Sequence, residues 1–393
     1  MTAYQFKTNR PIKMSRYSTT TRPQQRIITV ENLVLKDDVS DLCFSYNSHY
    51  LAITSWDGAV NVLEFNDDYS ESKLKTSWTA PSSKAMGVGT SSGFGTSMNF
   101  GATSGTKVAC LRCVFRPSDD ILYFSTSIGE IYSWDLSTNN KAEAIHSEKP
   151  DDPRKGPIVC LKWNDTANCL VGLGLTSSMS NALGLGGSMI TLASESSRID
   201  LDYKPIAMDV SGKFAVVVGT NGSNIIYCYD LSKPLTQNVQ KVVINSPLTR
   251  QFTSVACGPI ISNTANHPII IASNVFGQAD YIEGGDHHDT INLHINASQK
   301  SAMSSNSIIM IPGHKCAVSA GSDGSICFVN LDTKKTKSFS VTQVPLTKIA
   351  SNPQGTILAI SSGYDWSLGY EMSGREKPQP QLFVRQFNPS DYR

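Results

Sequence analysis

The sequence predicts an all-β protein built as a seven-bladed β-propeller. Short apolar runs rich in β-branched residues recur along the whole chain, separated by Gly, Asn, Asp and Pro, which is the pattern of many short strands. No long stretch repeats its apolar residues at helical spacing. An offset of 14 positions between the end of one apolar run and a turn glycine returns at distant places, and a fixed period indicates repeated structural units.

Composition excludes several other classes of protein. Of the 393 residues, 40% are hydrophobic and 17% are charged, and the formal net charge is +1. A wholly disordered chain would have fewer apolar residues and more uncompensated charge. A chain held to nucleic acid by bulk charge would be strongly basic, and no run reaches the roughly 20 apolar residues that cross a membrane. We therefore expect no membrane insertion.

The repeated unit is a set of three short strands joined by two turns. A tight Asp-Gly or Asn-Gly turn follows the second strand, because Gly and Asn tolerate the positive φ that such turns need. In three of the units, the third strand reaches a Trp-Asp-Leu-like triplet. The 14-residue offset connects four pairs of positions: Phe44 and Gly58, Phe115 and Gly129, Met208 and Gly222, and Met310 and Gly324.

Three further segments fit the same unit less closely. They are Ile158–Ser177, Phe252–Gly277 and Leu346–Tyr364, and they bring the count to seven. The early strand Ile28–Leu35 has no partner in its own unit. We expect it to supply the outer strand of the last blade, because closing the ring removes the exposed sheet edges of an open array.

Seven blades of about 40–45 residues leave part of the chain over. We predict a basic disordered arm at 1–27, a propeller at 28–387 and a tail at 388–393. Within the propeller, the Gly- and Ser-rich segment 80–106 is expected to be a flexible insert, and 177–188 and 284–306 are expected to be loops.

The arm contains six cations and no acid. Removing these cations leaves 28 Lys+Arg against 33 Asp+Glu, so the near-zero total hides an acidic body and a basic arm. Tyr4, Phe6 and Tyr17 lie among the cations, and stacking together with phosphate contact would suit single-stranded RNA; a solvated tail is the alternative. The candidate RNA-binding residues are Lys7, Arg10, Lys13, Arg16, Arg22 and Arg26.

Other short motifs are weaker. Phe94-Gly95 and Phe100-Gly101 lie in the uncharged insert, a composition typical of the Phe-Gly segments of nuclear pores, and a passive loop is the alternative. Cys110-x-x-Cys113 lies in an apolar strand pattern, and we interpret its thiols as buried hydrophobes. The loop pair His287-His288 has no flanking ligand motif. We predict no metal and no cofactor, and a chain without a signal peptide that stays in the cytosol or nucleus.

Two segments carry a resemblance to a known family. The overall repeat resembles WD-repeat propellers. The first unit, and the last unit with its Tyr364-Asp365-Trp366-Ser367 step, are similar to the family that contains the messenger-RNA export factor of the Gle/Rae type and the mitotic-checkpoint protein of the Bub type. The Tyr364 step and the Gly/Ser/Phe insert are closer to the export branch, whereas the closing Phe383–Gln386 is closer to the checkpoint branch.

The resemblance implies a non-catalytic scaffold at the nuclear pore that binds a nucleoporin peptide and supports messenger-RNA export. It implies a location at the nuclear envelope rim with cytoplasmic shuttling, and messenger RNA or an export receptor as further partners. The alternative is a spindle-checkpoint propeller that recruits checkpoint kinases to kinetochores. The candidate partner-binding residues are Trp56, Asp57, Tyr364, Asp365, Trp366, Phe94 and Phe100.

The chain departs from the family pattern in two places. A Lys-Cys-His-Arg string of the family is not recognisable near Ile291–Asn296. Family members place an arginine after the glycine of the blade-five turn, and this chain has Gln278 after Gly277. The other candidates also have purely structural interpretations. Trp56 and Asp57 can serve blade packing, and Tyr364 to Trp366 can cap the last blade. No nucleophile elbow, P-loop or dinucleotide motif is found. We expect no small-molecule substrate, although a propeller hydrolase or lyase with a site in the central channel is a third hypothesis.

Overall fold

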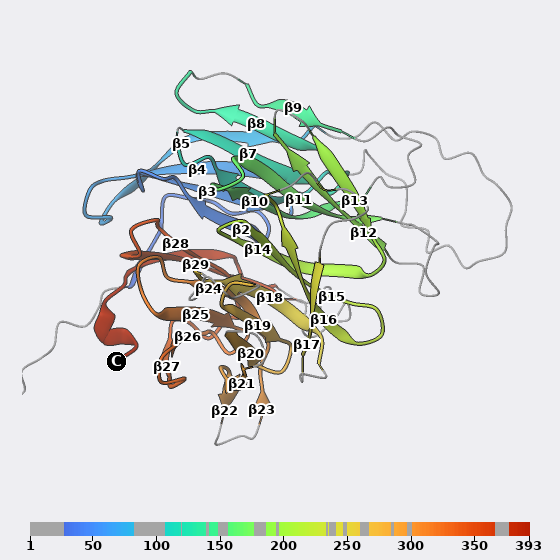
Figure 1. The fold of residues 1–393 in the computed structure, drawn as a ribbon. Coiled ribbons are helices and arrows are strands. Elements are labelled where there is room, and N and C mark those ends of the chain that lie inside the picture. The colour runs from blue at the N-terminus through green and yellow to red at the C-terminus, as the bar shows by residue number, and fades with distance from the viewer. Residues whose placement is uncertain are drawn as a thin grey trace, which may run out of the picture.

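The computed structural model describes residues 27–81, 107–365 and 377–393, apart from short gaps at 119, 139–140, 148–155, 177–185, 194–195, 233–234, 236–240, 247–249, 260–266, 284–286 and 297–300. In this part of the chain, seven four-stranded antiparallel sheets form the blades of a β-propeller. The predicted fold class is confirmed. Figure 1 shows the first strands of the blades, such as β2, β14, β18 and β24, near the centre of the ring.

The blades follow one another along the chain. Blade one comprises β2 (Val39–Phe44), β3 (Tyr50–Ser55), β4 (Ala59–Phe65) and β5 (Ser72–Thr79). Blade two comprises β6 (Cys110–Phe115), β7 (Ile121–Thr126), β8 (Ile131–Asp135) and β9 (Glu143–His146). Blade three comprises β10 (Ile158–Asn164), β11 (Cys169–Thr176), β12 (Gly186–Leu192) and β13 (Ser197–Leu201). Blade four comprises β14 (Lys204–Ser211), β15 (Phe214–Thr220), β16 (Asn224–Asp230) and β17 (Lys241–Asn245).

The C-terminal half completes the ring. Blade five comprises β18 (Phe252–Cys257), β19 (Ile270–Asn274), β20 (Gln278–Glu283) and β21 (His287–Asn292), and a small hairpin of β22 (Ile295–Asn296) and β23 (Ser301–Ala302) follows it. Blade six comprises β24 (Ser305–Met310), β25 (Cys316–Gly321), β26 (Ser325–Asn330) and β27 (Thr336–Ser340). Blade seven comprises β28 (Leu346–Ser351), β29 (Ile357–Ser362), β30 (Gln381–Gln386) and β1 (Ile27–Thr29), and the 3-10 helix η2 (Pro389–Asp391) ends the chain.

In blades one, two, four, five and six, the turn after the second strand contains a glycine with positive φ, as the sequence predicts. Gly58 and Gly324 have φ of 87° and 71°, in the left-handed region that L side chains rarely adopt. A side chain at Gly58 would also overlap the carbonyl group of Val108 in the connection to the next blade. The turn glycines therefore allow the chain to reverse where neighbouring backbones pack closely.

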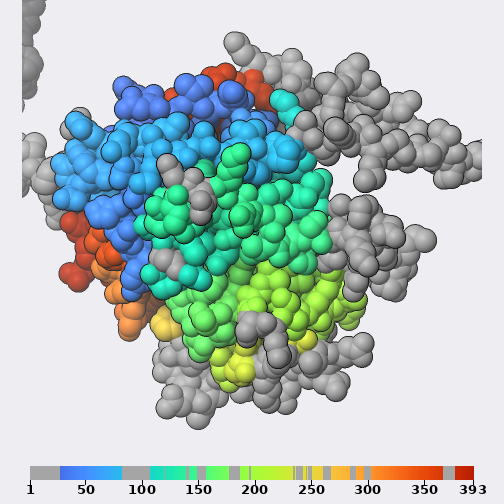
Figure 2. Space-filling view, turned by 90° about the horizontal axis from the view of Figure 1, so that it is seen from above, coloured from blue at the N-terminus to red at the C-terminus, as the bar shows by residue number. Residues whose placement is uncertain are grey.

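The ring closes between the two ends of the chain. Each first strand contacts the first strand of the next blade, and β28 contacts β2 to complete the circle. Strand β1 pairs with β30, so that Ile28 lies opposite Val384. This arrangement confirms the predicted closure, although the strand ends at Thr29 rather than at Leu35. Figure 2 shows the consequence, since atoms of the last blade (red) lie beside those of the first (blue).

The core lies between the blades. One apolar cluster joins blade one to blade seven and contains Leu42, Ile53, Ala359 and Val384, all less than a tenth exposed. Similar clusters lie between other neighbouring blades. Each sheet thus buries both faces against its neighbours, and this explains why the second strands are almost continuously apolar.

Two ranges expected to be loops contain strands. Residues 284–306 include β21 and the β22–β23 hairpin, and β24 begins at Ser305. Residues 177–188 include the start of β12 at Gly186. Strand β21 reads HHDTIN and β12 begins with two glycines and a serine, so neither has the apolar alternation by which a strand is recognised in a sequence.

Among the described residues, no helix has the length and apolar character needed to cross a membrane.

Candidate functional site

Each blade presents the same two features at one end of the propeller. The first strand begins there, and the antiparallel second strand ends there in its turn to the third strand. We call this end the entry face and the opposite end the exit face. Side chains on such turns and connections are held by a rigid scaffold without being buried by the sheets, so they are candidates for contacting a partner.

Asp38 joins two of the predicted residues on the entry face. Its backbone carbonyl accepts a hydrogen bond from the Trp56 amide at 3.1 Å, and its carboxylate Oδ1 accepts one from the Tyr364 amide at 2.9 Å. Burial raises the pKa of the Asp38 carboxyl, and the bond from Tyr364 opposes this rise. Gly363 is tied to the same contact, because a side chain there would overlap the Asp38 carboxylate.

These two predicted residues differ in what they offer a partner. The Trp56 side chain is 48% exposed, whereas Tyr364 is buried and has the Lys377 ammonium 5.7 Å from its ring centroid. Asp57 accepts a hydrogen bond from the Ala59 amide at 2.9 Å, which is a turn-stabilising role. The structure thus places Trp56, Asp57 and Tyr364 together, and Trp56 is the one that presents a large apolar surface to solvent.

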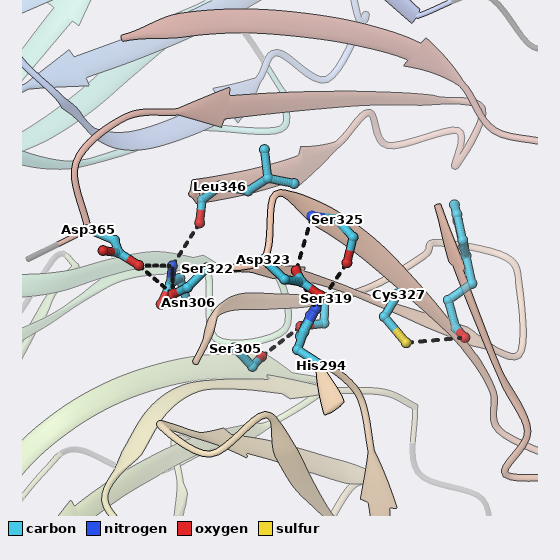
Figure 3. A network of polar contacts seen from close by, with 11 residues as sticks. His294, Ser305, Asn306, Ser319, Ser322, Asp323, Ser325, Cys327, Leu346 and Asp365 are labelled. Atoms are coloured by element: carbon cyan, nitrogen blue, oxygen red, sulfur yellow. Dashed lines mark hydrogen bonds and ion pairs between the residues drawn. The ribbon is translucent and has the colours of Figure 1, made fainter. Parts of the chain in front are cut away.

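Asp365 extends this region to blade six. Its Oδ2 accepts hydrogen bonds from the Asn306 amide at 3.3 Å and from the Ser322 hydroxyl. The same Asn306 amide donates to the carbonyl oxygen of Leu346 at 2.8 Å. Figure 3 shows these contacts joining the connection after β29 to the start of β24 and the blade-six turn.

A second polar network on blade six has the arrangement of a catalytic triad. His294 Nε2 lies 2.8 Å from Ser319 Oγ, and His294 Nδ1 lies 3.0 Å from Asp323 Oδ1 (Figure 3). Burial tends to raise the pKa of Asp323, but the hydrogen bond and charge of His294 lower it overall. Ser319 Oγ also lies 2.6 Å from the hydroxyl of Ser305.

This network is closed to any substrate. Ser319 is 0% exposed and His294 is buried, so the serine hydroxyl has no approach for a scissile bond. A side chain at Gly321 would overlap the His294 ring. We conclude that the network holds the connection between blades five and six against the blade-six turn.

Among the described residues, the largest group of exposed apolar side chains on the entry face lies over blade five. The turn between β19 and β20 exposes Val275 and Phe276, and the neighbouring hairpin exposes Ile295 and Met303. The Met303 amide donates to the carbonyl oxygen of His294 at 2.9 Å, and a side chain at Gly277 would overlap the Met303 carbonyl. These four residues and Arg250 are called the blade-five patch below.

Arg250 supplies a cation that was not predicted from the sequence. Its guanidinium carbon lies 4.5 Å from the centroid of the Phe276 ring, which is a cation–π arrangement. Gln278 instead hydrogen-bonds across to Asn292 at 3.3 Å. A positive charge is therefore present at the blade-five turn, but it comes from the connection that precedes β18 and not from the position after Gly277.

Several predicted residues lie outside the described part of the chain and remain predictions. They are Trp366, Phe94, Phe100, Lys7, Arg10, Lys13, Arg16, Arg22 and Arg26. Where the chain is described, no three His, Cys, Asp or Glu side chains gather as metal ligands. Cys110 and Cys113 are buried free thiols. Burial raises the pKa of Cys110 to about 12 and raises the pKa of Cys113 well above its ordinary value.

Comparisons with known proteins place this geometry among propellers. No family model matches the chain. A WD40 repeat protein, poxJ of Penicillium oxalicum, is 22% identical over 352 residues, which cover 87% of this chain and 88% of that protein. A solved structure of a mitotic checkpoint complex aligns over 99% of both chains with a TM-score of 0.57 and 12% identity, and this likeness concerns the fold alone.

Other sequence relatives are aligned over shorter ranges. Protein Rae1 of Drosophila melanogaster is 29% identical over 196 residues, 48% of this chain and 54% of that protein. An mRNA export factor of Xenopus tropicalis is 36% identical over 81 residues, which cover 20% of this chain and 22% of that protein. The chain is a seven-bladed WD-repeat propeller, and its sequence is similar to that of Rae1-type messenger-RNA export factors.

Proposed function

We propose that this protein is a non-catalytic scaffold at the nuclear pore that binds a nucleoporin peptide along its entry face and supports messenger-RNA export. The observation that carries the proposal is the exposed blade-five patch, in which Arg250 lies over Phe276. The similarity to relatives named as export factors supports the choice of process.

We infer that an extended peptide would follow the entry face. Going around the ring from blade five, the path meets Phe276, the polar groups of Asn306 and Asp365, and finally Trp56 on blade one. Exposed aromatic anchors at both ends, with hydrogen-bonding groups between them, are the features by which short peptides are recognised. The charge of Arg250 favours a peptide with an acidic residue beside its apolar anchor.

Affinity purification tests the proposal directly. The tagged full-length protein should recover Phe-Gly nucleoporins from a nuclear-envelope extract, and a Phe276→Ser, Arg250→Ser variant should recover much less. The matched control is Tyr46→Ser, because Tyr46 is an exposed aromatic residue in the exit-face turn between β2 and β3. Equal recovery by all three proteins would contradict binding at the blade-five patch.

The arm and the insert extend the proposal. The cations of residues 1–27 would contact messenger RNA, so deletion of the arm should lower RNA affinity and flatten its dependence on salt. Phe94 and Phe100 would add weak contacts within the pore, and replacing both by Ser should reduce accumulation at the nuclear rim. Unchanged RNA binding or unchanged accumulation would contradict the respective role. We also propose that the protein itself moves between the nucleus and the cytoplasm.

The checkpoint alternative rests on the closing strand. Phe383, Val384 and Arg385 resemble the checkpoint branch, but all three are buried, and Arg385 pairs with Asp391 at 3.0 Å. This likeness therefore reflects packing of the last blade and does not select a partner. Recovery of checkpoint kinases without nucleoporins would favour the alternative.

A further inference from the structure

A cavity of about 1130 Å³ occupies the central channel and extends toward the exit face. Its wall includes Asp41, Arg112, Lys162, Asp209 and Lys348 from the first strands of five blades, and its mouth includes Lys315. The cavity is large enough for a small ligand. It lies away from the proposed peptide path, so the inference below is independent of the proposed function.

Three of these charged residues occupy the same level of the ring. Near its beginning, each first strand has a register shift in its pairing with the second strand. Asp41, Arg112 and Lys348 are each the first residue to pair after that shift. They belong to blades one, two and seven, which are neighbours in the closed ring. Lys162 and Asp209 lie two positions further along the first strands of blades three and four.

The cations inside the cavity outnumber the anions. Lys162 Nζ lies 3.0 Å from Asp209 Oδ1, so these two charges compensate each other. Arg112 donates from Nη1 to the carbonyl oxygens of Ser40 at 3.0 Å and Leu111 at 2.7 Å, and these contacts fix its guanidinium without neutralising it. Asp41 is the carboxylate left to compensate both Arg112 and Lys348.

The charged residues at the mouth of the cavity do not offset the excess of cations inside it. Lys315 pairs with Asp332 at 2.9 Å, and Lys334 lies 3.7 Å from Glu283. Each of these cations therefore has its own carboxylate, and the excess positive charge remains inside the channel at Lys348 and Arg112.

Lys348 is the cation with unused hydrogen-bond donors. It is partly buried, and among the described residues its ammonium makes no hydrogen bond or ion pair, although the charges of Arg112 and Asp41 act on it through space. We propose that Lys348 and Arg112, with Lys162 nearby, bind a small multivalent oxyanion of the phosphate class in the central channel. Such a ligand would accept charge-assisted hydrogen bonds from both side chains and compensate their charge.

The pH dependence of this site depends on one residue. Burial, followed by the charge of Arg112, lowers the pKa of Lys348 to about 8. Asp209 raises the pKa of Lys162, and burial raises the pKa of the channel thiols Cys43 and Cys160. Asp41 and Asp209 are the facing carboxylates. Affinity for an anion of constant charge should therefore fall about tenfold from pH 7 to pH 9.

Titration calorimetry of the full chain tests the site. Inorganic phosphate and sulfate at fixed ionic strength are the probes, and chloride is the reference. Wild type and Lys315→Met should bind both oxyanions, whereas Lys348→Met should lose at least tenfold in affinity. Lys348→Arg should retain binding and lose the decline with sulfate between pH 7 and pH 9, because arginine stays charged.

Three results would overturn the proposal. The first is equal binding by Lys348→Met and wild type, which would place the anion elsewhere. The second is an equal response to chloride, which would show screening alone. The third is absence of binding by a folded wild-type protein, with folding checked by circular dichroism.

Discussion

The blade-five patch makes the sharpest quantitative prediction about partner binding. Replacing Phe276 by Ala should weaken binding of a nucleoporin peptide about 30-fold and leave the propeller folded. Phe276 lies in a turn between β19 and β20 and belongs to neither of the apolar clusters that contain blade-five residues. Removing an exposed side chain of this kind usually changes the free energy of unfolding by about 0.5 kcal/mol or less.

The expected loss follows from the exposed area of the ring. The Phe276 residue is 41% exposed, and an aromatic side chain has roughly 150–250 Å² to bury. About 80 Å² is thus available to a partner, and at ~25 cal/mol per Å² its burial contributes about 2 kcal/mol. A loss of about 2 kcal/mol corresponds to about a 30-fold increase in the dissociation constant.

Fluorescence anisotropy with a labelled peptide, mapped from the recovered nucleoporin, measures this constant, and urea unfolding measures stability. Tyr46→Ala removes an aromatic ring that is 60% exposed on the opposite face, so its affinity should stay at the wild-type value. An effect of Phe276→Ala below threefold, or an equal loss in Tyr46→Ala, would refute the reasoning.

Three further predictions concern stability. Asp391→Ala should lower the free energy of unfolding in urea by about 3–5 kcal/mol, because the buried guanidinium of Arg385 loses its carboxylate 3.0 Å away; a loss below about 1 kcal/mol would contradict this. Lys348→Met should raise the free energy of unfolding at pH 7 by about 1–3 kcal/mol, since burial lowers the pKa of the folded-state lysine to about 8. Because the unfolded lysine keeps its ordinary pKa of 10.5, this difference in stability should narrow as the pH rises from about 8 and vanish above about 10.5, where the lysine is neutral in both states. A difference that widens in pH-dependent urea titrations would be inconsistent with this. Gly321→Ala should lower the melting temperature, because the added methyl group would overlap the His294 ring. An unchanged melting temperature would show that the His294 side chain can move aside without loss of stability.

Much of the fold could be predicted from local patterns in the sequence. The 14-residue offset to Gly58 and its equivalents reflects a strand, a turn and a second strand of fixed length. Positive φ at these glycines makes the residue type itself informative. Outer strands such as β21 carry much less of this signal. They pack against fewer neighbours, and a sequence such as HHDTIN therefore satisfies the backbone pairing without an apolar face.

The candidate site was predictable only in part, because its main contacts cross between blades. Trp56 and Tyr364 meet at Asp38 although one lies in the first blade and the other in the last, and the resemblance pointed to both. Arg250 and Phe276 are separated by two strands, β18 and β19. Their only sequence signal is Val275-Phe276, an apolar pair in a turn where polar residues are usual.

The location of the protein in living cells tests the central claim most directly. A fluorescently tagged full chain should mark the nuclear rim in interphase, and the Phe276→Ser, Arg250→Ser variant should lose much of that signal while Tyr46→Ser keeps it. A wild-type protein absent from the rim and concentrated at kinetochores in mitosis would contradict a role at the pore. Rim staining that is equal in all three proteins would contradict docking through the blade-five patch.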